Sequence, residues 1–202
     1  MVVLDRKKLL GAVYALEVEG KRATPREVAA QLGLGKASVE ADLEGMASQG
    51  FIEYSRGAAK LTEKGRREVK VVFIGGGFEV IHRGHLHTIE QAKALGDVLV
   101  VSVARDSTIR KRKRRQPISD ENERVRLLSS LREVDAPILG VEGDIYDTLA
   151  RVRPDVVALG YDQYHMEGDV EEEARKRGLK LKVVRLGSPY PKIKTTGLLK
   201  EA

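Results

Sequence analysis

Residues 70–96, KVVFIGGGFEVIHRGHLHTIEQAKALG, decide the fold of this chain. Val71 to Ile74 is a short, continuous and largely β-branched apolar run, which predicts a buried strand. Gly75 to Gly77 open a loop, and from Gly84 onward apolar residues recur at helical spacing until Gly96 ends the pattern. This order predicts a phosphate site, because glycines let the backbone approach a ligand and free N–H groups at a helix start favour anions.

From residue 69 onward the chain alternates strand-like and helix-like segments. The expected strands cover residues 70–74, 98–103, 136–141, 155–159 and 181–186. The expected helices cover residues 84–95, 120–132, 145–152, 169–177 and 195–201. This alternation predicts an α/β domain with a five-stranded parallel sheet and helices on both faces. Right-handed crossovers then bring the C-terminal ends of all strands to one edge, where ligands bind.

Side chains that follow the strands should therefore meet at this edge. The first loop supplies His82 and His85. The later segments supply Arg105, the basic run 110–115, Arg124, the loop Gly160 to Gln163, and residues 188–196. Taken alone, the basic run is compatible with a solvated loop or a nucleic-acid tether. As part of this site, we expect it to close over phosphates.

Three of these segments carry a family resemblance. His82-Arg83-Gly84-His85 matches the HxGH signature of the nucleotidyltransferase superfamily, which includes cytidylyltransferases, pantetheine-phosphate adenylyltransferase and archaeal FAD synthases. Glu121 to Arg124 lies where that superfamily has a helix-borne arginine, and Lys194-Thr195-Thr196 resembles its ISTT-like motif. The resemblance covers residues 70–202 and implies a Rossmann-like enzyme. Such enzymes transfer a nucleoside monophosphate from a nucleoside triphosphate to a phosphorylated acceptor and release pyrophosphate.

Within the superfamily, three further segments resemble archaeal FAD synthases. They are ARDSTIRKRKRRQPIS at residues 104–119, VDAPILG at 134–140 and LGYDQ at 159–163. The resemblance implies that ATP and FMN react to give FAD and pyrophosphate. Cytidylyltransferases that use CTP and glycerol phosphate share most of the motifs, so they are the alternative.

The resemblance also assigns roles to single side chains. His82 and His85 are expected at the α-phosphate as catalytic groups, and Arg124 at the β- and γ-phosphates. The expected nucleotide-binding residues are Gly76, Gly77, Phe78, Gly84, Gly160, Asp162, Gln163, Lys194, Thr195 and Thr196. The residues expected to hold the acceptor phosphate are Arg105, Lys111 and Lys113. A divalent ion, expected to be Mg²⁺, would bridge phosphate oxygens and needs few protein ligands.

Plainer explanations exist for several of these residues. His82, His85 and His87 together suggest a zinc site, but His85 and His87 are two residues apart on a helix and point in different directions. We therefore expect no protein-built metal site. Asp162 is explained equally well as a turn cap, and Thr195 as a helix N-cap.

The glycine loop departs from the family pattern at two positions. The family has G-T/S-F-D before the HxGH signature, whereas this chain has Gly76-Gly77-Phe78-Glu79. Glycine at residue 77 removes a hydroxyl donor, and Glu79 is one methylene longer than aspartate. These departures place the acceptor or the metal arrangement in question.

Residues 1–68 predict a separate small domain. The pattern indicates a helix over 5–18, a second helix that begins at Thr24-Pro25 and ends at Gly33, a third over 35–49, and a hairpin over 51–62. Three helices followed by a hairpin are typical of a winged helix-turn-helix. Residues 23–67 resemble the DNA-binding domain of metal-dependent repressors of the diphtheria-toxin-repressor kind, and LTEKG after the hairpin is the most distinctive part.

The third helix of this domain argues against DNA binding. Glu40, Asp42 and Glu44 stand on it, and carboxylates repel phosphate. Residues 1–68 carry 12 lysines and arginines against 10 aspartates and glutamates, so they contribute only +2 of the net charge of +6. We expect a packing or dimerisation module. The alternative of another class is a nucleotide-sensing transcription factor that binds DNA through this domain.

Composition limits the remaining choices. The 202 residues contain no cysteine, which excludes disulfides and thiolate zinc sites, and the net charge of +6 suits phosphate-rich partners. No apolar run reaches the length of a membrane span, and Met1 is not followed by a signal-peptide core. We therefore expect a cytoplasmic protein without a membrane partner. The oligomeric state stays open, a homodimer included.

Overall fold

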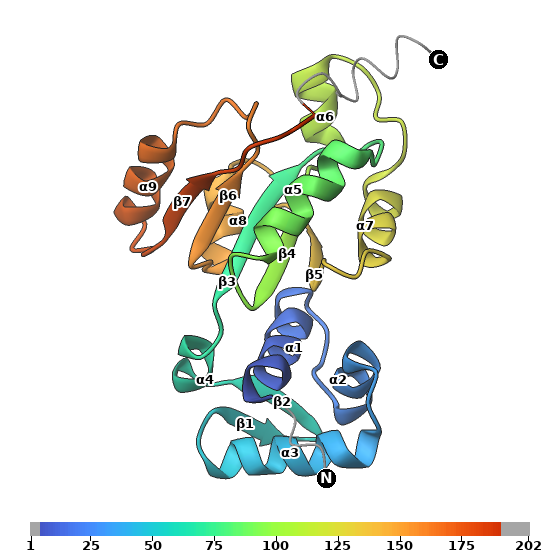
Figure 1. The fold of residues 1–202 in the computed structure, drawn as a ribbon, viewed down its shortest axis with the longest axis vertical. Coiled ribbons are helices and arrows are strands. Elements are labelled where there is room, and N and C mark those ends of the chain that lie inside the picture. The colour runs from blue at the N-terminus through green and yellow to red at the C-terminus, as the bar shows by residue number, and fades with distance from the viewer. Residues whose placement is uncertain (1–4, 191–202) are drawn as a thin grey trace. The chain divides into compact units, whose positions relative to one another are not determined.

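The computed structural model describes residues 5–190. Contacts divide the chain into two compact units, Met1–Lys70 and Val71–Ala202 (Figure 1). The expected domain boundary after residue 68 lies two residues before this division. No helix within residues 5–190 is long and apolar enough to cross a membrane.

The first unit contains three helices, a hairpin and a short fourth helix, in the expected order. Thr24 caps the second helix by accepting the N–H of Glu27 at 3.3 Å. The N–H of Ala59 donates to the carbonyl of Ala23 at 2.9 Å, which joins the segment before that helix to the hairpin. The elements are α1 (Arg6–Val18), α2 (Pro25–Leu32), α3 (Lys36–Ser48), β1 (Ile52–Ser55), β2 (Ala58–Leu61) and α4 (Glu63–Arg67).

The second unit is the expected α/β domain. Its five strands are all parallel and follow the order β5-β4-β3-β6-β7, so the predicted five-stranded sheet is confirmed. Helices lie on both faces of the sheet (Figure 1). The elements are β3 (Val71–Gly76), α5 (Arg83–Lys93), β4 (Val98–Val103), α6 (Asp106–Lys113), α7 (Glu121–Ser129), β5 (Ala136–Leu139), α8 (Ile145–Val152), β6 (Val156–Leu159), α9 (Glu167–Lys176) and β7 (Lys182–Arg185).

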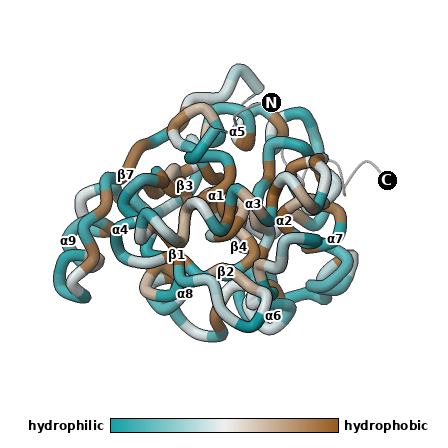
Figure 2. The backbone as a smooth tube through the Cα atoms, turned by 90° about the horizontal axis from the view of Figure 1, so that it is seen from below, coloured by the Kyte–Doolittle hydropathy of each residue, from teal (hydrophilic) through white to brown (hydrophobic). Residues whose placement is uncertain are grey.

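Strands β3 and β4 form the centre of this core, because they are buried on both faces. Val72 and Ile74 pack in one cluster with Ile89 of α5 and Leu128 of α7. The strands accordingly carry continuous apolar sequence, whereas α9 is mostly hydrophilic (Figure 2). This arrangement places the ends of β3 and β4 beside one another, with Gly76 opposite Val103.

Besides the short α4, one further helix is not predicted by the sequence pattern. The segment after β4 was interpreted as a loop, but Asp106 to Lys113 forms α6, in which only Ile109 is buried. Glu121 of α7 accepts the N–H of Asp106 at 2.8 Å and so caps α6 from another element. The helix over 195–201 predicted from the sequence lies entirely outside the described residues.

Candidate functional site

The loop after β3 brings two histidines together. His82 is the N-cap of α5, with an extended backbone at φ −137°, and His85 lies in the first turn of this helix. Their rings stack with centroids 3.9 Å apart and an interplanar angle of 28°. Phe78, whose φ is +48°, contacts His85 with its ring centroid at 5.3 Å. The free N–H groups at the start of α5 are therefore accompanied by two imidazoles.

The surroundings of both histidines favour the neutral imidazole. Burial, followed by the neighbouring His82, lowers the pKa of His85 to about 4, and burial also lowers the pKa of His82. The Nδ1 atoms of both side chains are buried and have no hydrogen-bond partner within residues 5–190. A neutral imidazole has one N–H donor and one acceptor nitrogen. Because these Nδ1 atoms are closed to solvent, a ligand in the cavity would meet the two rings through Nε2.

These histidines line a cavity of about 250 Å³, here called the histidine cavity. Gln163 donates from Nε2 to the carbonyl of Gly75 at 2.8 Å, which fixes the loop after β6 to the end of β3. Six of the ten expected nucleotide-binding residues line the cavity: Gly76, Phe78, Gly84, Gly160, Asp162 and Gln163. The other lining residues are Ile74, Gly75, His82, His85, Thr88, Lys113, Ala158 and Tyr161.

A second cavity of about 270 Å³, here called the apolar cavity, adjoins the first. The two share Gly75, Gly76, Lys113, Ala158 and Gln163. Successive side chains of β3 point to opposite faces of the sheet. Ile74 accordingly lines the histidine cavity, and Phe73 lines the apolar cavity. The expected nucleotide-binding residue Gly77 lines the apolar cavity rather than the histidine cavity.

Glu79 connects the glycine loop with the basic run. Its buried carboxylate accepts hydrogen bonds from Lys113, from Arg115 at 2.7 and 3.1 Å, and from the N–H of Ile118 at 3.3 Å. Burial alone would raise the pKa of Glu79, but the hydrogen bonds from Arg115 and Lys113 outweigh it and lower the pKa to about 2. The longer side chain at this position therefore holds the basic run against the loop before His82.

The structure corrects the expected place of Arg124. Its side chain is fully buried and lines none of the three cavities formed by the described residues. Nη1 donates to the carbonyls of Gly77 and Ala104 at 2.7 and 2.8 Å, and Nη2 pairs with Asp106 at 2.5 Å. Arg124 thus joins the loops after β3 and β4, and its guanidinium is occupied by these partners within the protein.

The three residues expected to bind the acceptor phosphate differ in position, since Arg105 and Lys113 line the apolar cavity and Lys111 lines neither the apolar cavity nor the histidine cavity. Arg105 donates to the carbonyl of Gly140 at 2.8 Å and pairs with Glu121 at 2.7 Å, so its guanidinium is occupied within the protein. Lys111 is exposed on α6 and lines none of the cavities that the described residues form. Lys113 alone among the three lines both the histidine cavity and the apolar cavity.

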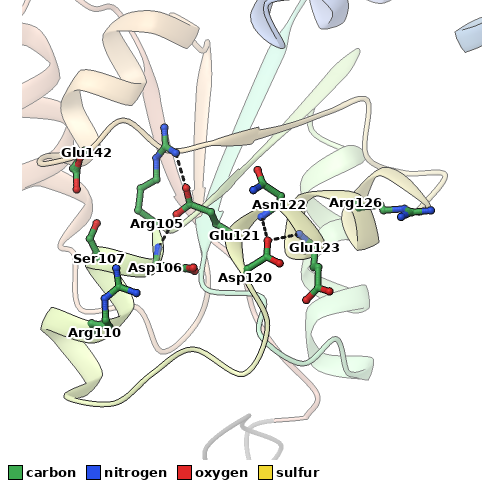
Figure 3. Close-up of a pocket in the computed structure, with 10 residues that line it drawn as sticks. All are labelled: Arg105, Asp106, Ser107, Arg110, Asp120, Glu121, Asn122, Glu123, Arg126 and Glu142. Atoms are coloured by element: carbon green, nitrogen blue, oxygen red, sulfur yellow. Dashed lines mark hydrogen bonds and ion pairs between the residues drawn. The ribbon is translucent and has the colours of Figure 1, made fainter.

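A third hollow, of about 700 Å³, lies between the N-terminal ends of α6 and α7 (Figure 3). Charged side chains line it, and the Arg105–Glu121 pair closes one side. Asp120 faces the N–H groups of Asn122 and Glu123 as the cap of α7, at 2.8 and 3.0 Å. Glu121 of α7 also accepts hydrogen bonds from Arg105 and from the N–H of Asp106, which joins the two helices. Neither His82 nor His85 lines this hollow.

Sequence reasoning missed the residues that hold the loop after β6. Arg185 of β7 donates to the carbonyls of Gly160 and Gln163 at 3.1 and 3.0 Å, and to that of His165. It also pairs with Glu167 at 2.6 Å. No local sequence pattern predicts these contacts, because Arg185 and its partners are about 20 residues apart along the chain.

Two expectations about ligands remain. Lys194, Thr195 and Thr196 lie outside the described residues. Among residues 5–190, no three His, Cys, Asp or Glu side chains gather as a metal site. Asp162 is the one carboxylate that lines the histidine cavity in the described part of the chain.

Comparison with known proteins identifies the class. Residues 73–200 match the cytidylyltransferase-like family, and the chain belongs to this family. The predicted class of enzyme, a nucleotidyltransferase with a Rossmann-like fold, is therefore confirmed.

Individual relatives indicate which kind of nucleotidyltransferase the chain resembles. The FAD synthase of Archaeoglobus profundus is 49% identical over 118 residues, which cover 58% of this chain and 74% of the relative. The FAD synthase of Thermococcus kodakarensis is 43% identical over 129 residues, covering 63% of this chain and 85% of the relative. A crystal structure described as a lipopolysaccharide core biosynthesis protein from Thermoplasma volcanium aligns with a TM-score of 0.57 and 44% identity, covering 59% and 98% of the two chains. The predicted resemblance to archaeal FAD synthases is confirmed.

Proposed function

We propose that this protein transfers AMP from ATP to FMN, forming FAD and pyrophosphate. One observation carries the proposal: the histidine cavity, with its helix N-terminus, adjoins the apolar cavity at Gly75, Gly76 and Lys113. Two substrates bound in the two cavities would meet at the end of β3. The likeness to proteins named FAD synthase supports FMN as the acceptor.

The chemistry asks for alignment more than for a protein nucleophile. A phosphate oxygen of the acceptor is already a nucleophile at neutral pH, and it attacks the α-phosphorus of the nucleotide in line. A new phosphorus–oxygen bond forms as the bond to the bridging oxygen breaks, and pyrophosphate leaves with that electron pair. Fixing both substrates in one geometry supplies much of the acceleration.

The residues of the histidine cavity have the donors that this step requires. N–H groups of His82, His85 and the first turn of α5 would hydrogen-bond oxygens of the α-phosphate as negative charge develops on them. Lys113, which lines both cavities, would balance the charge of the approaching phosphate. Mg²⁺ would enter as the nucleotide complex and take few protein ligands, and Asp162 is the carboxylate among the described residues that line the histidine cavity.

A pyrophosphate-release screen tests the proposal. ATP and CTP are each offered with FMN, glycerol 3-phosphate or phosphopantetheine in the presence of Mg²⁺, and FAD is identified by chromatography. We expect turnover with ATP and FMN. Turnover with CTP and glycerol 3-phosphate, without any with ATP and FMN, would establish the alternative of a phospho-alcohol cytidylyltransferase instead.

For the first unit we propose a winged helix-turn-helix that packs and does not read DNA. Glu44 is exposed on α3 and Glu40 is half-buried. Burial, followed by the charges of Glu40 and Glu44, raises the pKa of Tyr54 on β1, so these two carboxylates act on the neighbouring strand. We expect no binding to duplex DNA at low salt. Binding that weakens steeply with added salt would favour the nucleotide-sensing regulator.

A further inference from the structure

The apolar cavity has walls that a small phosphorylated alcohol does not need. Most of the surface that lines it is apolar, and the side chains that provide this surface include Phe73, Ile109, Val141, Ile145, Val157 and Leu159. Polyols lose hydrogen bonds to water when they enter such a site, whereas flat aromatic groups gain contact. The volume of about 270 Å³ lies just below the roughly 300–1,000 Å³ typical of pockets for drug-sized ligands. One ring system would fill it.

Planar side chains stand at the mouth of this cavity. Tyr164 is 67% exposed although it lines the cavity, and its ring lies 4.1 Å from the ring of His165 at an angle of 32°. The guanidinium of Arg112 on α6 lies 5.2 Å from the centre of the Tyr164 ring. An exposed tyrosine flanked by two further planar groups offers a stacking surface for an aromatic ligand.

The wall that carries Tyr164 is held from both sides. Arg185 binds the carbonyls on either side of Tyr164, those of Gln163 and His165. Gln163 in turn binds Gly75 at the end of β3. A preformed wall loses little conformational entropy when a ligand binds, so stacking there contributes fully to affinity.

We propose that the apolar cavity binds the isoalloxazine ring of the acceptor, with Tyr164 as the residue that selects an aromatic acceptor. This inference rests on the proposed function, because it names the site of FMN in that reaction. The phosphate of FMN then lies at Lys113, where the apolar cavity meets the histidine cavity. The nucleotide is left to the histidine cavity.

Kinetics and flavin binding in the full chain test the inference. We expect Tyr164→Ala to raise the KM for FMN and the dissociation constant of riboflavin, followed by flavin fluorescence, by about tenfold, as for other lost aromatic stacks. The KM for ATP should change less than about twofold. Tyr164→Phe keeps the ring and should behave like the wild type.

Two further variants serve as controls for the Tyr164 result. Tyr146→Ala removes a tyrosine that also lies under a guanidinium, that of Arg177 at 4.7 Å, but lines neither the histidine cavity nor the apolar cavity in the described structure, so flavin binding should persist. Val141→Trp places a large side chain at the half-exposed edge of the apolar cavity and should block riboflavin.

The outcomes separate the two claims. If FAD forms but Tyr164→Ala and Val141→Trp leave FMN kinetics and riboflavin binding unchanged, the ring site is overturned and the proposed function stands. A wild-type protein that binds neither riboflavin nor FMN overturns the ring site as well. If no FAD forms while riboflavin binds and both variants weaken it, the proposed function fails and the ring site stands.

Discussion

His85 is the residue on which the proposed chemistry depends most directly, because it stacks on His82 and lines the histidine cavity. Replacing His85 by alanine should lower the rate of FAD formation by about a hundredfold or more if its N–H stabilises the transition state. His87→Ala is the matched control, since His87 packs on Tyr190 and lines none of the three cavities formed by the described residues. Rates near those of the wild type for His85→Ala would remove this residue from the mechanism.

The same histidine predicts how stability depends on pH. Its pKa falls from the ordinary 6.5 to about 4 in the folded protein, so between these pH values the unfolded chain binds more protons. The free energy of unfolding should therefore be highest above pH 6.5 and fall as the pH is lowered toward 4. Urea denaturation at pH 7.5, 6.0 and 4.5 measures this slope. His85→Asn, which cannot be protonated, should show a smaller slope than the wild type.

Glu79 is the departure from the family pattern that the structure explains. Glu79→Gln would leave Lys113 and Arg115 without their shared carboxylate, and these cations are 39% and 35% exposed. We expect a loss of about 1–3 kcal/mol in the free energy of unfolding, less than for a fully buried pair. Thermal unfolding measures it. The control Glu90→Gln, at an exposed site on α5, should stay within about 0.5 kcal/mol.

The stabilisation by Glu79 also has a defined pH window. Because the folded pKa is lowered from 4.5 to about 2, its contribution is complete above pH 4.5 and is lost as the pH falls toward 2. No effect of Glu79→Gln on unfolding at pH 7 would show that the basic run is not held by this residue.

At the scale of single residues, the sequence predicts some positions and does not predict others. His82 and His85 are three residues apart, so their meeting at a helix start follows from local structure. Arg124 lies beside the ends of β3 and β4, but the direction of its side chain depends on the Gly77 and Ala104 carbonyls, which are 47 and 20 residues away. Distance along the chain, rather than residue type, limits prediction.

Among the elements, α6 shows the same limit. Its sequence is highly charged and has one buried side chain, so periodicity gives no helical signal. The cap comes from Glu121, 15 residues further along the chain. The strands, by contrast, were predictable because burial on both faces demands continuous apolar runs.

The LTEKG segment, which runs from the last residue of β2 into α4, gives a prediction at the element scale. Thr62 accepts the N–H of Gly65 at 3.1 Å and donates to the carbonyl of Phe51 at 3.0 Å. A Cβ at residue 65 would lie 2.0 Å from that carbonyl oxygen. Gly65→Ala should therefore cost about 3 kcal/mol, the upper end of overpacking costs. Faster hydrogen exchange within residues 5–70 would report it.

A second glycine serves as the control for this contact. Gly45 lies inside α3, and a Cβ there would meet nothing within 4 Å. Gly45→Ala should stabilise the first unit by about 0.5–1 kcal/mol through helix propensity. Equal effects of the two substitutions would mean that α4 does not pack on Phe51 as described.

At the scale of the whole molecule, the chemistry belongs to one of the two units. The family match spans residues 73–200, and every residue of the histidine cavity and the apolar cavity lies within Val71–Ala202. Strand β3 also begins with a bond inside this unit, from the N–H of Val71 to Asp155 at 2.7 Å. Neither the donors nor the walls of the site require the first unit.

Residues 71–202 alone should therefore keep nucleotidyl transfer. We expect their kcat/KM for FMN to stay within about threefold of the full chain, a difference of about 0.7 kcal/mol in transition-state binding. Circular dichroism checks that the shortened chain is folded, and His85→Ala in the same background sets the inactive reference. A folded but inactive fragment would show that the first unit acts on the site. That result would favour the hypothesis of a nucleotide-sensing regulator.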